Sequence, residues 1–134
     1  MNNKTISRCI KFALSKASEH PYYVTKNTVY RISSFRHFSF IIQGTTIVGW
    51  GWNHHGDAPS GFGYIGGTVH AEVHAYERSK DKLKGTFEVL NIRLNRQNEL
   101  RLSSPCMCCM KFLKIFGCKH VYFSTDVGIA SMKL

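Results

Sequence analysis

The chain has 134 residues, 43% of them hydrophobic, which predicts a single domain over residues 1–134 with a substantial core. It contains no apolar run long enough to span a bilayer, and its N-terminus lacks the apolar stretch of a secretory signal. This pattern predicts no membrane-spanning helix, and we expect an intracellular, cytoplasmic location. The formal net charge is +10, with basic residues gathered before residue 37 and after residue 77. Such flanks favour a polyanionic partner, with a merely cationic surface as the alternative.

The first half of the chain predicts a helix, a hairpin and a long loop. The periodicity of apolar residues indicates an amphipathic helix over 5–18, and Pro21 is expected to mark its end. Two strands over 35–43 and 46–52 are predicted to form a hairpin. The segment 53–67 is rich in glycine and is predicted to be a loop.

The second half alternates helices and strands. The predicted elements are a helix over 69–78, a strand over 87–95, a helix over 106–116, a strand over 119–124 and a short last strand over 129–133. Thr68 is expected to be the N-cap of the first of these helices, and Gly117 to end the second. The alternation implies crossover connections, and therefore an α/β fold with a mixed sheet covered by helices.

Two short motifs bring together residues with the chemistry of a metal site. His70 and Glu72 occur in His-Ala-Glu, and Cys106 and Cys109 occur in Pro-Cys-Met-Cys-Cys. We expect His70, Cys106 and Cys109 to bind one Zn²⁺, because one His and two thiolates leave its fourth position open, as in a catalytic site. The two cysteines are three residues apart and share one face at the start of a helix. Glu72 is the candidate catalytic residue, since a carboxylate there can transfer protons.

The combination His-x-Glu followed by Pro-Cys-x-x-Cys resembles the cytidine deaminase-like superfamily of zinc-dependent nucleoside, nucleotide and polynucleotide deaminases. The resemblance extends from the first strands to the strand after the second motif. It implies a three-layer α/β/α sandwich with a mixed five-stranded sheet, and a hydrolase that removes an amino group from a nucleobase. A short antiparallel last strand is similar to the branch that holds free nucleoside deaminases, plant organelle RNA editors and bacterial toxin deaminases.

The same resemblance suggests residues that contact the substrate. The stretch Val-Gly-Trp-Gly-Trp-Asn53 is similar to the approach to the active site in tRNA adenosine deaminases and deoxycytidylate deaminases, in which the Asn contacts the nucleoside. The resemblance also implies that the carbonyl of Thr68 or a neighbour and the amide of Ala71 touch the base. Ser104 would lie near the exocyclic amine, or would only cap the helix.

The first functional hypothesis is deamination of cytosine to uracil in single-stranded DNA or RNA, because a base in a duplex must first be unstacked. Phe62 and Tyr64 of the Gly-rich loop are candidates to stack on a base. The alternatives are a free cytidine or deoxycytidylate deaminase of pyrimidine salvage, an adenine deaminase acting on RNA, and a non-catalytic zinc module that would not need Glu72. We expect Cys108 to pack and His74 to support the site or the core. The oligomeric state stays open.

Overall fold

The computed structural model describes residues 1–19, 23–25, 28–30 and 36–134. Its elements, in chain order, are α1 (Asn3–Glu19), β1 (Tyr23–Thr25), β2 (Thr28–Tyr30), β3 (Arg36–Gln43), β4 (Thr46–Trp52), β5 (His54–Gly56), β6 (Gly67–Val69), α2 (Ala71–Ser79), the 3-10 helix η1 (Lys80–Lys82), β7 (Phe87–Leu94), β8 (Leu100–Arg101), α3 (Met107–Ile115), β9 (Cys118–Thr125) and β10 (Gly128–Lys133).

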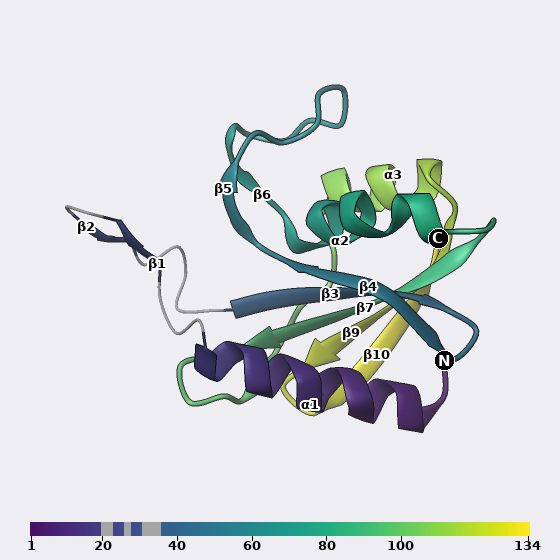
Figure 1. Ribbon diagram of the computed structural model, residues 1–134, viewed down its shortest axis with the longest axis horizontal. Coiled ribbons are helices and arrows are strands. Elements are labelled where there is room, and N and C mark those ends of the chain that lie inside the picture. Colours follow the sequence, from purple (N-terminus) through teal and green to yellow (C-terminus); the bar gives the residue numbers. More distant parts are fainter. Residues whose placement is uncertain (20–22, 26–27, 31–35) are drawn as a thin grey trace.

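The central sheet has the strand order β10-β9-β7-β3-β4, and β8 pairs with β7 beside this path. The β7–β9 pair is parallel and the other pairs are antiparallel, so the sheet is mixed, as predicted. Helix α1 covers one face of the sheet, and α2 and α3 cover the other (Figure 1). The predicted three-layer α/β/α architecture is therefore confirmed. No helix in the described part of the chain is both long and apolar enough to cross a membrane.

Alternation along the strands divides the core between the two faces. On β7, Val89 packs with the α2 and α3 side, whereas Leu90 and Ile92 pack with the α1 side. The same alternation on β3 places Ile41 on the α2 and α3 side. Successive strand residues point to opposite faces, so His37 and Ser39 share the face of Ile41, and Asn91 shares the face of Val89. These polar positions lie on the face that carries both predicted metal-binding motifs.

The structure differs from the predicted elements at the Gly-rich segment. Within 53–67, and continuing to Val69, strands β5 and β6 form a two-stranded antiparallel sheet where the sequence predicted only a loop. Thr68 pairs with His55 in this sheet, so the prediction that Thr68 is the N-cap of α2 is wrong. Predictions for Pro21 and Phe35 concern positions outside the described residues.

Helix α2 lies unusually close to the edge strand β4, and Gly51 makes this possible. A Cβ atom on Gly51 would lie 2.3 Å from the backbone nitrogen of Ala75, far inside contact distance. Only a residue without a side chain therefore fits between the strand and the helix. This close packing fixes the height of α2 above the sheet, and with it the position of the residues at the start of the helix.

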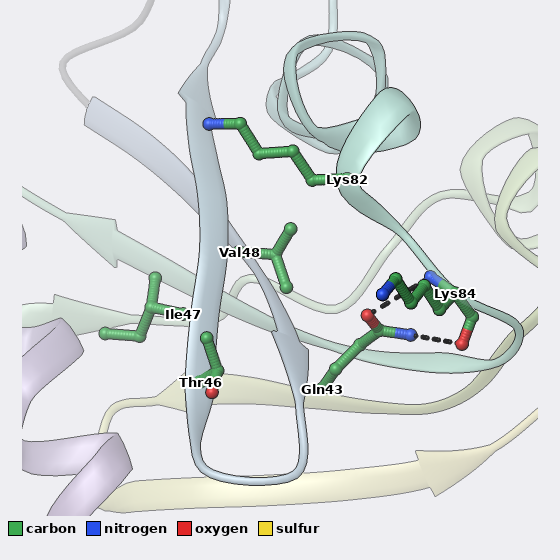
Figure 2. A pocket seen from close by; sticks show the side chains of 6 residues that line it. All are labelled: Gln43, Thr46, Ile47, Val48, Lys82 and Lys84. Atoms are coloured by element: carbon green, nitrogen blue, oxygen red, sulfur yellow. Dashed lines mark hydrogen bonds between the residues drawn. The ribbon is translucent and has the colours of Figure 1, made fainter.

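An open hollow of about 560 Å³ lies at the hairpin end of β3 and β4 (Figure 2). It is lined by Gln43, Thr46, Ile47, Val48, Lys82 and Lys84. The side-chain amide of Gln43 donates to the carbonyl of Lys84 at 2.9 Å and joins the hairpin to the segment before β7. This hollow contains none of the predicted site residues.

Candidate metal centre and active site

The predicted metal ligands lie at the N-termini of the two helices that cover one face of the sheet. His70 is the N-cap of α2, with extended backbone angles (φ −72°, ψ 151°). Cys106 is the N-cap of α3, and its sulfur accepts from the backbone N–H of Cys109 at 3.5 Å. Both helices therefore begin one residue after a ligand, and their positive ends favour the thiolate form of cysteine.

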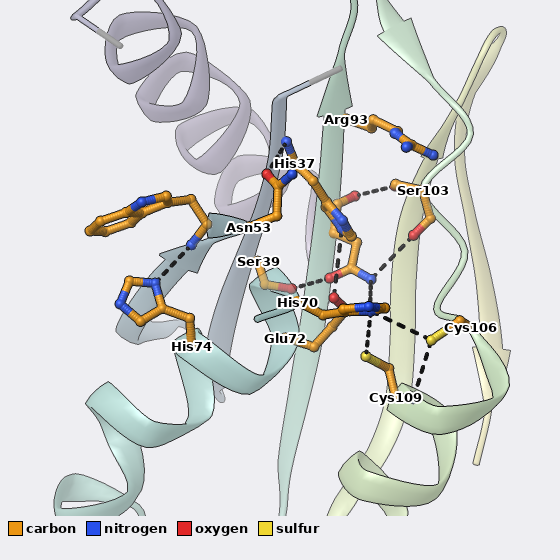
Figure 3. A network of polar contacts seen from close by, with 12 residues as sticks. His37, Ser39, Asn53, His70, Glu72, His74, Arg93, Ser103, Cys106 and Cys109 are labelled. Atoms are coloured by element: carbon orange, nitrogen blue, oxygen red, sulfur yellow. Dashed lines mark hydrogen bonds and ion pairs between the residues drawn. The ribbon is translucent and has the colours of Figure 1, made fainter. Parts of the chain in front are cut away.

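The three side chains converge on one point. Their ligand atoms all lie within 4.8 Å of one another. The Nδ1 atom of His70 is 3.6 Å from Sγ of Cys106 and 3.4 Å from Sγ of Cys109 (Figure 3). Tetrahedral zinc, with bonds of about 2.3 Å to sulfur and 2.0 Å to nitrogen, would hold such atoms about 3.5 Å apart. The donor set and its spacing therefore fit zinc, and Cys108 is not part of the group.

The protonation of the cluster also suits a metal. The hydrogen bond from the Cys109 thiol, with smaller help from His70, lowers the pKa of Cys106 to about 3. The hydrogen bond to Cys106 raises the pKa of His70. The pKa of Cys109 is raised by its hydrogen bond to Cys106 and by burial. The lowered pKa favours the thiolate at Cys106, the form that zinc binds, and metal binding would displace the proton of the Cys109 thiol.

Glu72 lies beside the ligands, held by a polar network that begins on the sheet. Its side chain is 1% exposed, and its Oε2 atom accepts from the amide of Asn91 at 3.1 Å. The Asn91 amide also donates to the carbonyl of Ser103 at 3.2 Å, while its oxygen accepts from the hydroxyl of Ser39. Asn91 is therefore held by β3 and by the segment before α3, and it presents one side-chain N–H to the carboxylate of Glu72.

The other oxygen of Glu72 faces His37. Oε1 of Glu72 and Nε2 of His37 are 3.9 Å apart, and neither buried atom has a hydrogen-bond partner among the described residues (Figure 3). Burial lowers the pKa of His37, against the opposing effect of Glu72, so the imidazole is neutral at pH 7. A small polar group that contacts both atoms would satisfy them.

Sequence reasoning missed Asn91, Ser39 and His37. A signal for them exists, because polar residues occupy positions on β3 and β7 where the apolar alternation predicts a buried face. That signal says only that the residues are buried and polar, which a structural network would also explain. Their role becomes visible only when Glu72 is placed against the sheet.

Asn53, the predicted nucleoside contact, lies directly after β4 and beside His37. The side-chain oxygen of Asn53 accepts from the backbone N–H of His37 at 3.2 Å, and the backbone N–H of Asn53 donates to the carbonyl of His37 at 3.3 Å. Ala71 is fully buried as the first residue of α2, directly before Glu72. Ser104 is exposed, and the serine that joins the Glu72 network is its neighbour Ser103.

Phe62 and Tyr64, the predicted stacking residues, both contact α3. The ring of Phe62 lies 5.1 Å from the ring of Phe112. Tyr64 places its hydroxyl 2.9 Å from Sγ of Cys109 and its ring 4.9 Å from the imidazole of His70. The loop is thus brought to the metal-ligand cluster. Stacking of either ring on a base stays a prediction.

His74 lies on α2, one turn after His70, and has a structural role. Its Nδ1 atom accepts from the backbone N–H of Trp52 at 3.1 Å, and its ring packs against Trp52 and His54. Burial, with the nearby charges of His54 and Arg78, lowers the pKa of His74 to about 4. His74 therefore joins α2 to β4 as a neutral acceptor, and is not among the three side chains that converge at the metal site.

No family model and no curated protein matches the sequence. Solved structures do match the fold. The chain is similar to the dCMP deaminase of cyanophage S-TIM5 in complex with dCMP and dUMP, with a TM-score of 0.56, 19% identity, and coverage of 92% of this chain and 82% of that chain. The apo form of the same enzyme gives a TM-score of 0.54 and 19% identity, with 92% and 84% coverage.

A second kind of deaminase matches equally well. The cytidine deaminase of Mycobacterium leprae has a TM-score of 0.56 and 15% identity, covering 91% of this chain and 88% of that chain. At these identities the likeness shows the fold. The chain therefore has the cytidine deaminase-like fold, as the sequence motifs predicted.

Proposed function

We propose that the protein is a zinc-dependent hydrolase that deaminates cytosine to uracil in a nucleotide. The observation that supports this most strongly is the convergence of His70, Cys106 and Cys109 within 4.8 Å, with the buried carboxylate of Glu72 beside them. A structural zinc site would be closed by a fourth protein ligand, whereas this group offers three. A non-catalytic module would also have no use for a buried carboxylate at this position, since burying one is costly.

The residues divide the chemistry between them. His70, Cys106 and Cys109 would hold zinc, which when bound lowers the pKa of a coordinated water to about 7 and supplies a nucleophile at neutral pH. Glu72 takes up the two protons of the attacking water in turn and passes one to the ring nitrogen and the other to the departing amine. Cytosine and water thus become uracil and ammonia, with no net proton left on the enzyme.

The network around Glu72 supports this proton-transfer role. The side-chain amide of Asn91 donates to Oε2 of Glu72 at 3.1 Å, which leaves Oε1 of Glu72 as the oxygen that can exchange protons. His37 lies 3.9 Å from Oε1, and its neutral ring can contact the same substrate atom without competing for the carboxylate as a cation. Asn53 borders His37 and keeps its side-chain N–H₂ group available for a sugar hydroxyl, because the contact to His37 uses its oxygen.

A free pyrimidine nucleotide is the substrate that the placement of charge favours. Lys4, Arg8 and Lys11 are exposed on α1, which covers the sheet face opposite the metal ligands (Figure 1). Lys82 and Lys84 border the hollow beside Gln43. Gln43 and His37 lie near opposite ends of β3, about 20 Å apart at a rise of about 3.3 Å per residue. These cations of α1 and of the segment 82–84 therefore do not flank the site in space. One of the structural relatives was solved with dCMP and dUMP.

Single-stranded nucleic acid is the second candidate, supported by a smaller basic group. Arg93 pairs with His37 in the β3–β7 register and with Arg101 in the β7–β8 register. Arg96 is exposed in the segment that follows β7. These cations lie at the end of the sheet that carries the site and would meet the phosphates next to a target cytosine. The contact between Arg101 and Glu99 at 3.5 Å reduces the net positive charge there.

A parallel assay tests the proposal and separates the candidates. The zinc-loaded protein is incubated with dCMP, cytidine, single-stranded DNA and single-stranded RNA, and conversion of cytosine to uracil and of adenine to hypoxanthine is measured. Conversion of dCMP or cytidine alone supports a nucleotide or nucleoside enzyme, and conversion only in the polymers supports the second candidate. The Glu72→Gln variant is the matched control. Absence of conversion by the zinc-loaded protein on every substrate would overturn the proposed function.

A further inference from the structure

Tyr64 contacts two of the three metal ligands, each through a different part of its side chain. Its hydroxyl is 2.9 Å from Sγ of Cys109, and its ring meets the imidazole of His70 edge to face, at 4.9 Å and 68°. We propose that Tyr64 is a positioning residue of the metal centre, whose hydroxyl donates a hydrogen bond to the Cys109 thiolate while its ring fixes His70.

The direction of the hydrogen bond follows from the chemistry of metal binding. Cysteine binds zinc as a thiolate, which can accept a hydrogen bond and cannot donate one, so the O–H of Tyr64 must be the donor. Cys109 is fully buried, and its backbone N–H is directed at Cys106. A buried thiolate without a donor is costly, and charge-assisted hydrogen bonds are among the stronger ones. The Tyr64 hydroxyl therefore withdraws charge from this sulfur and fixes its orientation.

The loop that carries Tyr64 is built against α3. Phe62 packs on Phe112 at 5.1 Å and on Phe116 at 6.3 Å, which anchors the loop two residues before Tyr64. Between them, Gly63 has a φ of +92°, and an added Cβ would lie 3.5 Å from Sγ of Cys108. The loop therefore runs close over the start of α3, and from this anchor Tyr64 reaches across to His70 on the other helix.

This arrangement gives Tyr64 a role different from stacking on a base. Its hydroxyl and its ring are both engaged by ligands, so the residue links α3 to α2 through the metal site. Residues that hydrogen-bond to metal ligands commonly contribute 10–100-fold to metal affinity or activity. The inference rests on the metal site of the proposed function, but it does not depend on which base is deaminated.

The test compares Tyr64→Phe with Tyr76→Phe. Each variant removes one hydroxyl from a partly buried ring near α3, but Tyr76 packs against Phe112 and Phe116 and touches no ligand. Zinc affinity is measured by competition with a chelator, and the sulfur-to-metal charge-transfer band is recorded after substitution with Co²⁺. In Tyr64→Phe we expect zinc affinity to fall about 10-fold or more and the band to move to lower energy, because the thiolate becomes richer in electrons.

Tyr76→Phe should match the wild type in both measurements. An unchanged band and unchanged affinity in Tyr64→Phe would overturn the inference, and so would equal changes in both variants, which would indicate packing alone. Neither measurement requires turnover. A shifted band in a protein that deaminates no substrate would therefore support the role of Tyr64 and overturn only the proposed function.

Discussion

The hydrogen bond between Asn91 and Glu72 is the contact by which the sheet orients the carboxylate that we propose to be catalytic. Asn91 is fully buried, and the Asn91→Leu substitution keeps the branched shape and the number of heavy atoms of the side chain but removes all its hydrogen bonds. A hydrogen bond to a charged group is worth about 1.5–3 kcal/mol, and each neutral buried group left unpaired costs about 1–3 kcal/mol. Glu72, Ser103 and Ser39 all lose a partner. These values sum to about 3.5–9 kcal/mol, so we expect the free energy of unfolding to fall by at least about 4 kcal/mol.

A double-mutant cycle isolates the part of this loss that belongs to Glu72. Glu72→Gln keeps an oxygen acceptor but removes its charge, so Asn91→Leu should cost about 1 kcal/mol less in that background. Urea unfolding at a fixed free zinc concentration measures all four proteins. Ser39→Ala is the milder control, since it touches Asn91 but not Glu72. A coupling energy below about 0.5 kcal/mol, as for distant residues, would refute the view that Asn91 orients the carboxylate.

Two further predictions concern how α2 is held on β4. Gly51→Ala should lower the free energy of unfolding by about 1–3 kcal/mol and reduce activity. The reason is that a Cβ 2.3 Å from the backbone nitrogen of Ala75 would push away helix α2, whose start carries Glu72. An unchanged melting temperature would contradict the close packing. His74 has its pKa lowered from 6.5 to about 4. The unfolded chain therefore takes up this proton first, and stability should fall as pH drops from about 6.5 to about 4. His74→Asn keeps an acceptor for Trp52 and should show a smaller fall between pH 7 and pH 5, measured by urea unfolding; an equal fall would exclude His74 as its source.

The meeting of His70, Cys106 and Cys109 and the layers of the fold could be predicted because both depend on local patterns. The cysteines at positions 106 and 109 are three residues apart, so any helix that begins there brings their sulfurs together. The strands over 36–43 and 87–94 show their two faces through apolar alternation. Such patterns need no knowledge of distant contacts, which explains why the three-layer sandwich and the antiparallel last strand were predicted correctly.

The features that were missed depend on contacts between segments far apart in sequence. Thr68 is of a residue type favoured at N-caps, but β6 continues through Val69, so the chain becomes helical only after His70. Strands β5 and β6 pair across the Gly-rich segment without an apolar alternation that would predict them. The roles of Asn91 and His37 become apparent only once Glu72 is placed beside them, at 3.1 and 3.9 Å.

The central claim is that His70, Cys106 and Cys109 hold one zinc ion at which Glu72 performs a proton-transfer reaction on cytosine. The most direct test measures zinc content and uracil formation in the same preparations of wild type, Glu72→Gln and Cys106→Ala, with the substrate that the parallel assay selects. We predict one zinc and turnover for wild type, one zinc without turnover for Glu72→Gln, and neither for Cys106→Ala. Turnover by Glu72→Gln at the wild-type rate, or full zinc content in Cys106→Ala, would contradict this account.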